Sequence, residues 1–72
     1  MTDDSPSRLW TLAKDGRTMA GQVRLVPYGI EVDILRDGSV LVTRTFESGD
    51  EALAWAEEKR AARAKEGWHE PA

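Results

Sequence analysis

The chain has 72 residues, a formal net charge of −3 and a pI near 5.0, and it contains no cysteine. The acidic balance argues against strong electrostatic binding to nucleic acid or anionic membranes, which depends on clustered lysine and arginine. No apolar run approaches the about 18 residues of a membrane span, and the acidic start MTDDSPSR is unlike a signal peptide, so we expect one small cytoplasmic domain with no membrane partner.

Four strands are predicted in the first two thirds of the chain. Residues 1–7 are polar and contain a proline, and we interpret them as a disordered N-terminal tail. From residue 8 onwards apolar and polar residues alternate, and two Asp-Gly pairs and one Pro-Tyr-Gly sequence break the alternation. The predicted strands span residues 8–14, 17–26, 30–36 and 39–46. Because short connections make consecutive strands antiparallel neighbours, we predict a meander in the order 1-2-3-4.

The register of the hairpins decides which side chains share a face of this sheet. A two-residue turn at the first Asp-Gly pair sets Lys14 opposite Arg17. In the last hairpin, a two-residue turn would pair Ile34 with Leu41, whereas a three-residue loop pairs Ile34 with Val40. We predict the three-residue loop, because it gathers more apolar side chains on one face. The predicted inner face comprises Trp10, Leu12, Met19, Val23, Leu25, Ile30, Val32, Ile34, Val40, Val42 and Phe46.

After the fourth strand the pattern changes to that of a helix. SGDE is a capping box with Ser48 as the N-cap and Glu51 at the third helical position, and the alanine-rich run that follows ends at Gly67. We expect the apolar arc of this helix to cover the inner face, with Leu53 and Trp55 filling the space between helix and sheet. The arc comprises Ala52, Leu53, Trp55, Ala56 and Ala64, and the basic side chains of Lys59, Arg60 and Arg63 interrupt it and reach outward to solvent.

The predicted domain is therefore an α+β domain of the form ββββα. It spans residues 8–68, and residues 69–72 form a C-terminal tail. We expect Trp68 to fold back onto the open end of the core. Arg44 turns inward on the predicted register, where it can form a cation–π contact with Trp68 or Trp55.

Few residues could carry catalysis or bind a metal. His69 is the one histidine and lies near the end of the chain, and the serines occupy tail, turn and cap positions. Glu31 and Asp33 share the outer face of the predicted third strand, but Arg24 lies opposite Glu31, which favours an ordinary cross-strand ion pair. We therefore expect no enzyme activity, no metal site and no cofactor.

The outer face of the sheet is the main candidate for function. It carries short polar and apolar side chains, and the last strand, VLVTRTF, is an edge strand with no proline and one charged residue. Proteins usually protect such edges, so an unprotected one can receive a partner chain. The candidate interface residues are Leu9, Thr11, Arg24, Leu35, Leu41, Thr43 and Thr45.

The pattern that runs from LWTLAKDGRTMAG through DGSVLVTRTFESGDEALAWAEEKR to EGW resembles small uncharacterised bacterial proteins with a four-strand meander and a C-terminal helix ending in Gly-Trp. The resemblance covers residues 8–68 and implies a fold and a bacterial, cytoplasmic setting, without an activity. The architecture is also similar, more distantly, to transcription cofactors of the PC4/Whirly type, which bind single-stranded DNA. Those proteins present basic and aromatic residues on the sheet, whereas here Arg24 is the only base at the centre of the predicted outer face.

These observations predict a small non-enzymatic interaction module. We expect it to act through the outer face or the edge of the last strand and to form a homodimer or bind another protein. The alternative is a regulator that binds single-stranded nucleic acid weakly. Residues 8–46 favour that alternative slightly, because their six basic and four acidic residues give a net charge of +2.

Overall fold

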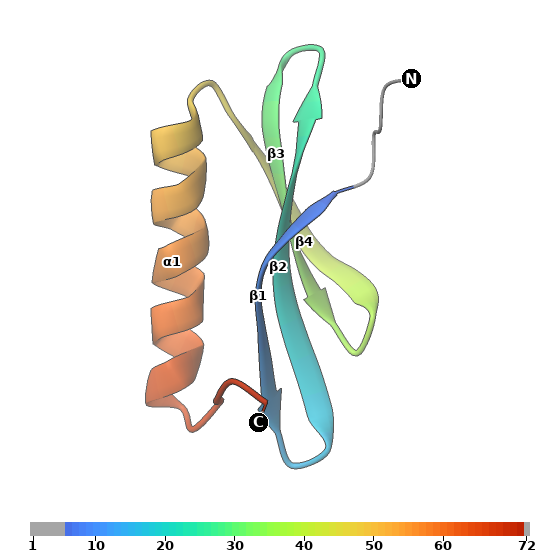
Figure 1. The fold of residues 1–72 in the computed structure, drawn as a ribbon, viewed down its shortest axis with the longest axis vertical. Helices are drawn as coiled ribbons and strands as arrows, with labels where there is room; N and C mark the ends of the chain where they lie inside the picture. Colours follow the sequence, from blue (N-terminus) through green and yellow to red (C-terminus); the bar gives the residue numbers. More distant parts are fainter. Residues whose placement is uncertain (1–5, 72) are drawn as a thin grey trace.

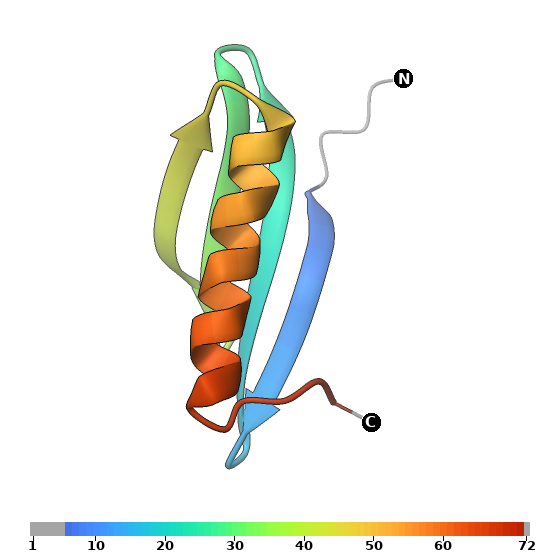
Figure 2. The same cartoon turned by 90° about the vertical axis from the view of Figure 1, so that its left-hand side faces the viewer.

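The computed structural model describes residues 6–71, a four-stranded antiparallel sheet with one helix against one face (Figure 1). The sheet order is β1-β2-β3-β4, which confirms the predicted meander and the α+β class. Figure 2 shows the helix lying along the strands over the middle of the sheet, with the outer strands on either side of it. The elements are β1 (Ser7–Lys14), β2 (Arg17–Val26), β3 (Gly29–Arg36), β4 (Ser39–Phe46) and α1 (Gly49–Lys65).

The β1–β2 hairpin has the predicted turn and an unpredicted bulge. Asp15 and Gly16 have φ angles of 50° and 77°, as a two-residue type I′ turn requires. At the far end of β1 the register shifts between Arg8 and Trp10, and Leu9 is half-buried and packs against the core. The prediction that Leu9 lies on the outer face is wrong, because a bulge interrupts the alternation of faces. Of the predicted N-terminal tail, residues 1–5 lie outside the described residues, and β1 begins at the seventh residue.

The β3–β4 hairpin closes with a shorter turn than predicted. Asp37 and Gly38 have φ angles of 50° and 86°, and Arg36 pairs directly with Ser39, so the predicted three-residue loop is wrong. The type I′ turn matches the right-handed twist of the flanking strands, and an Asp-Gly pair tolerates its positive φ angles. Two hydrogen bonds between Asp37 and Thr18, of 2.9 and 3.0 Å, tie this turn to β2.

A bulge at Leu41 then changes which side chains of β4 lie on each face of the sheet. The pairing shifts from Leu35–Val40 to Ile34–Val42, so Val42 lies beside Ile34 on the helix side and Val40 lies with Leu35 on the outer face. Leu41 and Val42 together line a groove on the helix side. The predicted pairing of Ile34 with Val40 and the predicted outer position of Leu41 are both wrong, because the chain takes the shorter turn and places the extra residue in the strand.

Both ends of α1 are capped as the sequence predicts. The Oγ atom of Ser48 accepts a hydrogen bond from the backbone N–H of Glu51 at 3.3 Å. At the other end Gly67 has a φ of 98°, and the N–H of Trp68 donates to the carbonyl oxygen of Arg63 at 3.2 Å. This is the arrangement in which a glycine ends a helix and the following residue satisfies one of the last carbonyl groups.

The sheet supplies most of the core. The buried residues of α1 are Ala52 and Ala56, and the predicted filling role of Leu53 is wrong, since Leu53 is 52% exposed. Instead Trp10 reaches across from β1 and donates a hydrogen bond from Nε1 to the carbonyl oxygen of Ala56 at 3.2 Å. The buried core cluster comprises Trp10, Leu12, Met19, Val32, Ile34, Ala52 and Ala56.

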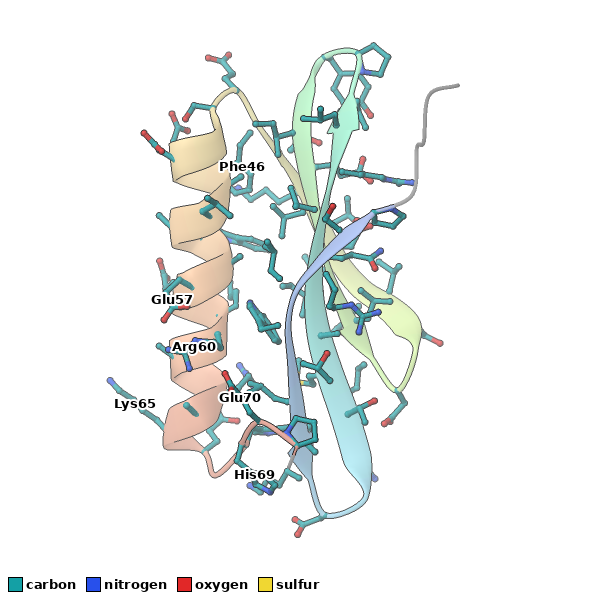
Figure 3. All side chains as sticks on the ribbon, viewed as in Figure 1. Phe46, Glu57, Arg60, Lys65, His69 and Glu70 are labelled. Atoms are coloured by element: carbon teal, nitrogen blue, oxygen red, sulfur yellow. The ribbon has the colours of Figure 1, made fainter. Side chains whose placement is uncertain are left out.

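Aromatic rings at the start of α1 extend this core. The ring centroids of Phe46 and half-buried Trp55 lie 5.6 Å apart, and Figure 3 shows Phe46 between the helix and the sheet. The Cζ atom of Arg44 lies 6.0 Å from the Trp55 ring, so that predicted cation–π contact is confirmed, and 5.2 Å from the Phe46 ring. Trp68 is half-buried and packs against the core, as expected. No helix within residues 6–71 is both long and apolar enough to cross a membrane.

Candidate functional site

The outer face of the sheet holds two buried carboxylates, Glu31 and Asp33. Arg24 donates from Nε to Glu31 Oε1 at 2.8 Å and from Nη2 to the same oxygen, and these hydrogen bonds are the main reason that the pKa of Arg24 is raised. Asp33 accepts hydrogen bonds from Gln22 Nε2 at 3.1 Å and from Thr43 Oγ1 at 2.8 Å. The predicted pair of Arg24 and Glu31 is confirmed, and both carboxylates are bonded within the sheet.

Five of the seven candidate interface residues share this outer face. They are Thr11, Arg24, Leu35, Thr43 and Thr45. The other two, Leu9 and Leu41, lie toward the core and on the helix side. A hollow of about 250 Å³ on the outer face is lined by Arg8, Thr11, Thr18, Ala20, Leu35 and Gly38. The outer face therefore combines this mixed hollow with the hydrogen-bonded carboxylates.

The two edge strands of the sheet, β1 and β4, differ in whether another segment of the chain pairs with them. At β1, Ala13 donates its N–H to the carbonyl oxygen of His69 at 2.7 Å and accepts from the N–H of His69 at 3.1 Å. The residues after α1 therefore cover part of this edge. Along β4, no segment of residues 6–71 pairs with the strand on the side away from β3. Three successive apolar side chains there, Val40, Leu41 and Val42, are 56%, 60% and 41% exposed.

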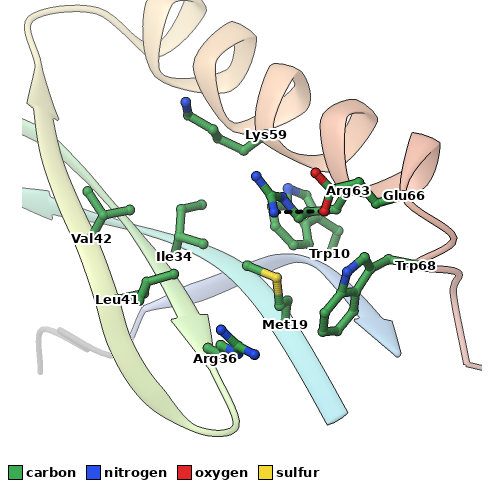
Figure 4. A pocket seen from close by; sticks show the side chains of 10 residues that line it. All are labelled: Trp10, Met19, Ile34, Arg36, Leu41, Val42, Lys59, Arg63, Glu66 and Trp68. Carbon is green, nitrogen blue, oxygen red and sulfur yellow. Dashed lines mark hydrogen bonds and ion pairs between the residues drawn. The ribbon is translucent and has the colours of Figure 1, made fainter. Parts of the chain in front are cut away.

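A groove of about 400 Å³ opens between the C-terminal half of α1 and the sheet (Figure 4). Its apolar lining comprises Trp10, Met19, Ile34, Leu41, Val42 and Trp68, and its charged lining comprises Arg36, Lys59, Arg63 and Glu66. The sequence pattern places Lys59 and Arg63 within the apolar arc of the helix, and both side chains were predicted to reach solvent. The groove was not predicted, and the sequence signal that could have indicated it is the presence of these two cations inside an apolar arc.

The third basic residue of that arc, Arg60, has a local partner. Arg60 donates from Nε to Glu57 Oε2 at 2.8 Å and from Nη2 to Oε1, and Figure 3 shows both side chains along α1. The hydrogen bonds from Arg60 are the main reason that the pKa of Glu57 is lowered. The ring of His69 is exposed, with Nδ1 3.2 Å from the carbonyl oxygen of Glu70. Residues 6–71 hold no group of three or more side chains that could bind a metal ion.

Comparison of the chain with protein-family models, with curated proteins and with solved structures found no match. The four strands and the C-terminal helix are the architecture on which both resemblances rest. They do not assign the chain to a family.

Proposed function

We propose that this protein is a small non-enzymatic interaction module that forms a homodimer by pairing the β4 edges of two copies. The observation that carries the proposal is the contrast between the two edges. His69 pairs with Ala13 at the β1 edge, whereas among residues 6–71 nothing pairs with the outer side of β4, which also carries exposed apolar side chains. Unpaired edge groups are a template for another strand.

Edge-to-edge pairing would give a two-fold symmetric dimer. The four-stranded sheets of the two copies would join at β4 into one continuous sheet of eight strands. Pairing would use β4 from Val40 to Phe46, with the bulge at Leu41 near one end of the contact. The exposed side chains of β4 lie on both faces, Val40 on the outer face and Val42 on the helix side, so the contact would bury apolar surface on both sides of the joined sheet.

The alternative, binding of single-stranded nucleic acid on the outer face, has less support. That face has two buried carboxylates at its centre, and the guanidinium of Arg24 is already held by Glu31. The aromatic rings that could stack on bases lie elsewhere: Trp10, Phe46, Trp55 and Trp68 pack on the helix side, and exposed Tyr28 lies in the β2–β3 turn. A nucleic-acid platform needs exposed aromatic rings together with free basic side chains.

The test is the molar mass in solution, measured by light scattering on a sizing column at several concentrations. We expect the wild-type mass to be twice 8.0 kDa. Val40→Lys and Leu41→Lys each place a charge on the open edge and should weaken the dimer by about tenfold or more, because an unpaired charge would be buried in the contact. Leu25→Lys is the matched control, since Leu25 is an exposed residue of β2 away from this edge.

A wild-type mass of 8.0 kDa at every concentration would refute the dimer. A dimer that survives both edge substitutions, or that Leu25→Lys disrupts equally, would place the contact elsewhere on the molecule. Circular dichroism of each variant checks that the fold is intact, so that a change of mass can be assigned to the interface.

A further inference from the structure

We propose that the groove between α1 and the sheet binds a small amphipathic carboxylate, with an apolar chain or ring and one carboxylate group. This site goes beyond the proposed dimer, because every residue that lines it belongs to one copy of the chain. Its volume of about 400 Å³ lies in the range of small-molecule sites. Its floor is apolar and its rim is mainly cationic.

The floor of the groove favours an apolar body. Trp10 and Met19 come from β1 and β2, and Trp68 follows the helix, so three separate segments supply it (Figure 4). Ile34, Leu41 and Val42 form the opposite part of the floor, and the β4 bulge is what brings Leu41 to this side. Aliphatic and aromatic side chains of this kind gain free energy when they exclude water from an apolar ligand.

The rim of the groove favours an anionic group. The charged lining has three cationic side chains, those of Arg36, Lys59 and Arg63. It has one carboxylate, that of Glu66, which already accepts a hydrogen bond from Arg63 at 3.0 Å. Within residues 6–71, Arg36 and Lys59 form no ion pair with a carboxylate. Figure 4 shows Lys59 on the helix side of the groove and Arg36 on the sheet side. A bound carboxylate could therefore accept a charge-assisted hydrogen bond from a cation on either side.

Two nearby interactions bear on whether the rim can hold an anion. Lys59 Nζ lies 5.2 Å from the Trp55 ring, and this cation–π contact does not occupy the N–H donors of the ammonium group. The carbonyl groups at the end of α1 would repel an anion, but the carbonyl oxygen of Glu66 accepts a hydrogen bond from Lys14 Nζ. The site therefore combines an apolar floor with unpaired positive charge.

The test is an NMR titration of the full chain with sodium octanoate below its micelle concentration. We expect saturable shifts of the indole N–H signals of Trp10 and Trp68, with a dissociation constant on the order of 1 mM for so small a ligand. Octylammonium has the same chain with the opposite charge and should cause no saturable shift. The amide signal of Tyr28, in the distant β2–β3 turn, should not move with either compound.

Substitutions of the rim separate charge recognition from simple contact with apolar surface. Arg36→Gln and Lys59→Gln should each raise the dissociation constant by about threefold, and the double variant by about tenfold. Arg17→Gln removes the same charge from the exposed β1–β2 hairpin, outside the groove, and should leave binding unchanged.

Equal binding of octylammonium and octanoate, or unchanged binding by the double variant, would overturn the proposal, and so would the absence of saturable shifts. The result is separate from the proposed dimer. A monomeric wild type that still binds octanoate would refute the dimer alone, and a dimer without octanoate binding would refute the ligand site alone.

Discussion

At the scale of single residues, the contact between Trp10 and Gly21 decides how α1 sits on the sheet. The two residues pair across β1 and β2, and a Cβ atom at Gly21 would lie 2.6 Å from Cε2 of Trp10. Because Gly21 has no side chain, the indole can lie flat over it and still reach the carbonyl oxygen of Ala56. The alanines of the helix can approach the sheet only as far as this indole allows.

We expect Gly21→Ala to lower the free energy of unfolding by about 1–3 kcal/mol, because the added methyl group would displace a buried ring from a packed core. Chemical denaturation measures this. Gly49→Ala is the control, since a Cβ atom at Gly49 would lie 3.7 Å from Ile30, an ordinary contact, and this substitution should not destabilise the protein. Equal stability of the two variants would show that Trp10 is free to move.

At the scale of elements, α1 depends on its ends and its local pairs more than on an apolar stripe. Its fully buried residues are two alanines, Trp55 is half-buried, and Leu53 points largely to solvent. Local interactions support it instead. Glu57 pairs with Arg60, Arg63 pairs with Glu66, and Ser48 caps the first turn. Exposed ion pairs of this kind add little individually, so the cap should be the strongest of these local contributions.

Ser48→Ala should therefore lower the free energy of unfolding by about 1 kcal/mol, because the N–H of Glu51 loses its acceptor. Ser48→Asp supplies another acceptor and should restore the stability of the wild type. Thermal unfolding followed by circular dichroism at 222 nm, the usual helix signal, compares the three proteins. The cap would be irrelevant if the alanine variant melted at the wild-type temperature, or if the aspartate variant melted as early as the alanine variant.

At the scale of the whole molecule, the segment after α1 completes the fold. Trp68 packs against the core and lines the groove, and His69 pairs with Ala13 at the β1 edge. A chain of 72 residues buries a small core, so a few such contacts are a large part of its stability. In the part of the chain that the structure describes, no segment pairs with the β4 edge, which is why the proposed dimer is placed there.

Ending the chain after Trp68 should increase hydrogen exchange at the Ala13 amide by about tenfold or more, because that N–H loses the carbonyl oxygen of His69. His69→Ala keeps the backbone groups and should leave the amide protected. Hydrogen exchange followed by NMR measures both, with the amide of Val32 in the central strand as the reference for global opening. Equal loss of protection in the two variants would mean that the His69 side chain, and not its backbone, holds the segment in place.

Most of the fold could be predicted from local patterns. The strands, the meander and both ends of the helix follow from period-two alternation, Asp-Gly turns, Ser48 and Gly67, all of which act over a few residues. The register of β4 could not be predicted, because an Asp-Gly pair fits both a two-residue and a three-residue turn. The cross-strand pairing of Arg24 and Glu31 was predicted correctly, because their hairpin has no bulge.

The sequence by itself determined which segments form strands and helix and in what order they pair, because turn geometry and capping are set by neighbouring residues. Only the tertiary structure decided where Leu41 and Leu53 lie and how Trp10 fills the core. It also decided that, within the described residues, the β1 edge is partly covered while the β4 edge has no strand partner. The groove is also a feature that only the tertiary structure decided. Arg36 and Lys59 come to face the same apolar floor only when α1 docks on the sheet, and the position of that helix depends on packing between residues far apart in the chain.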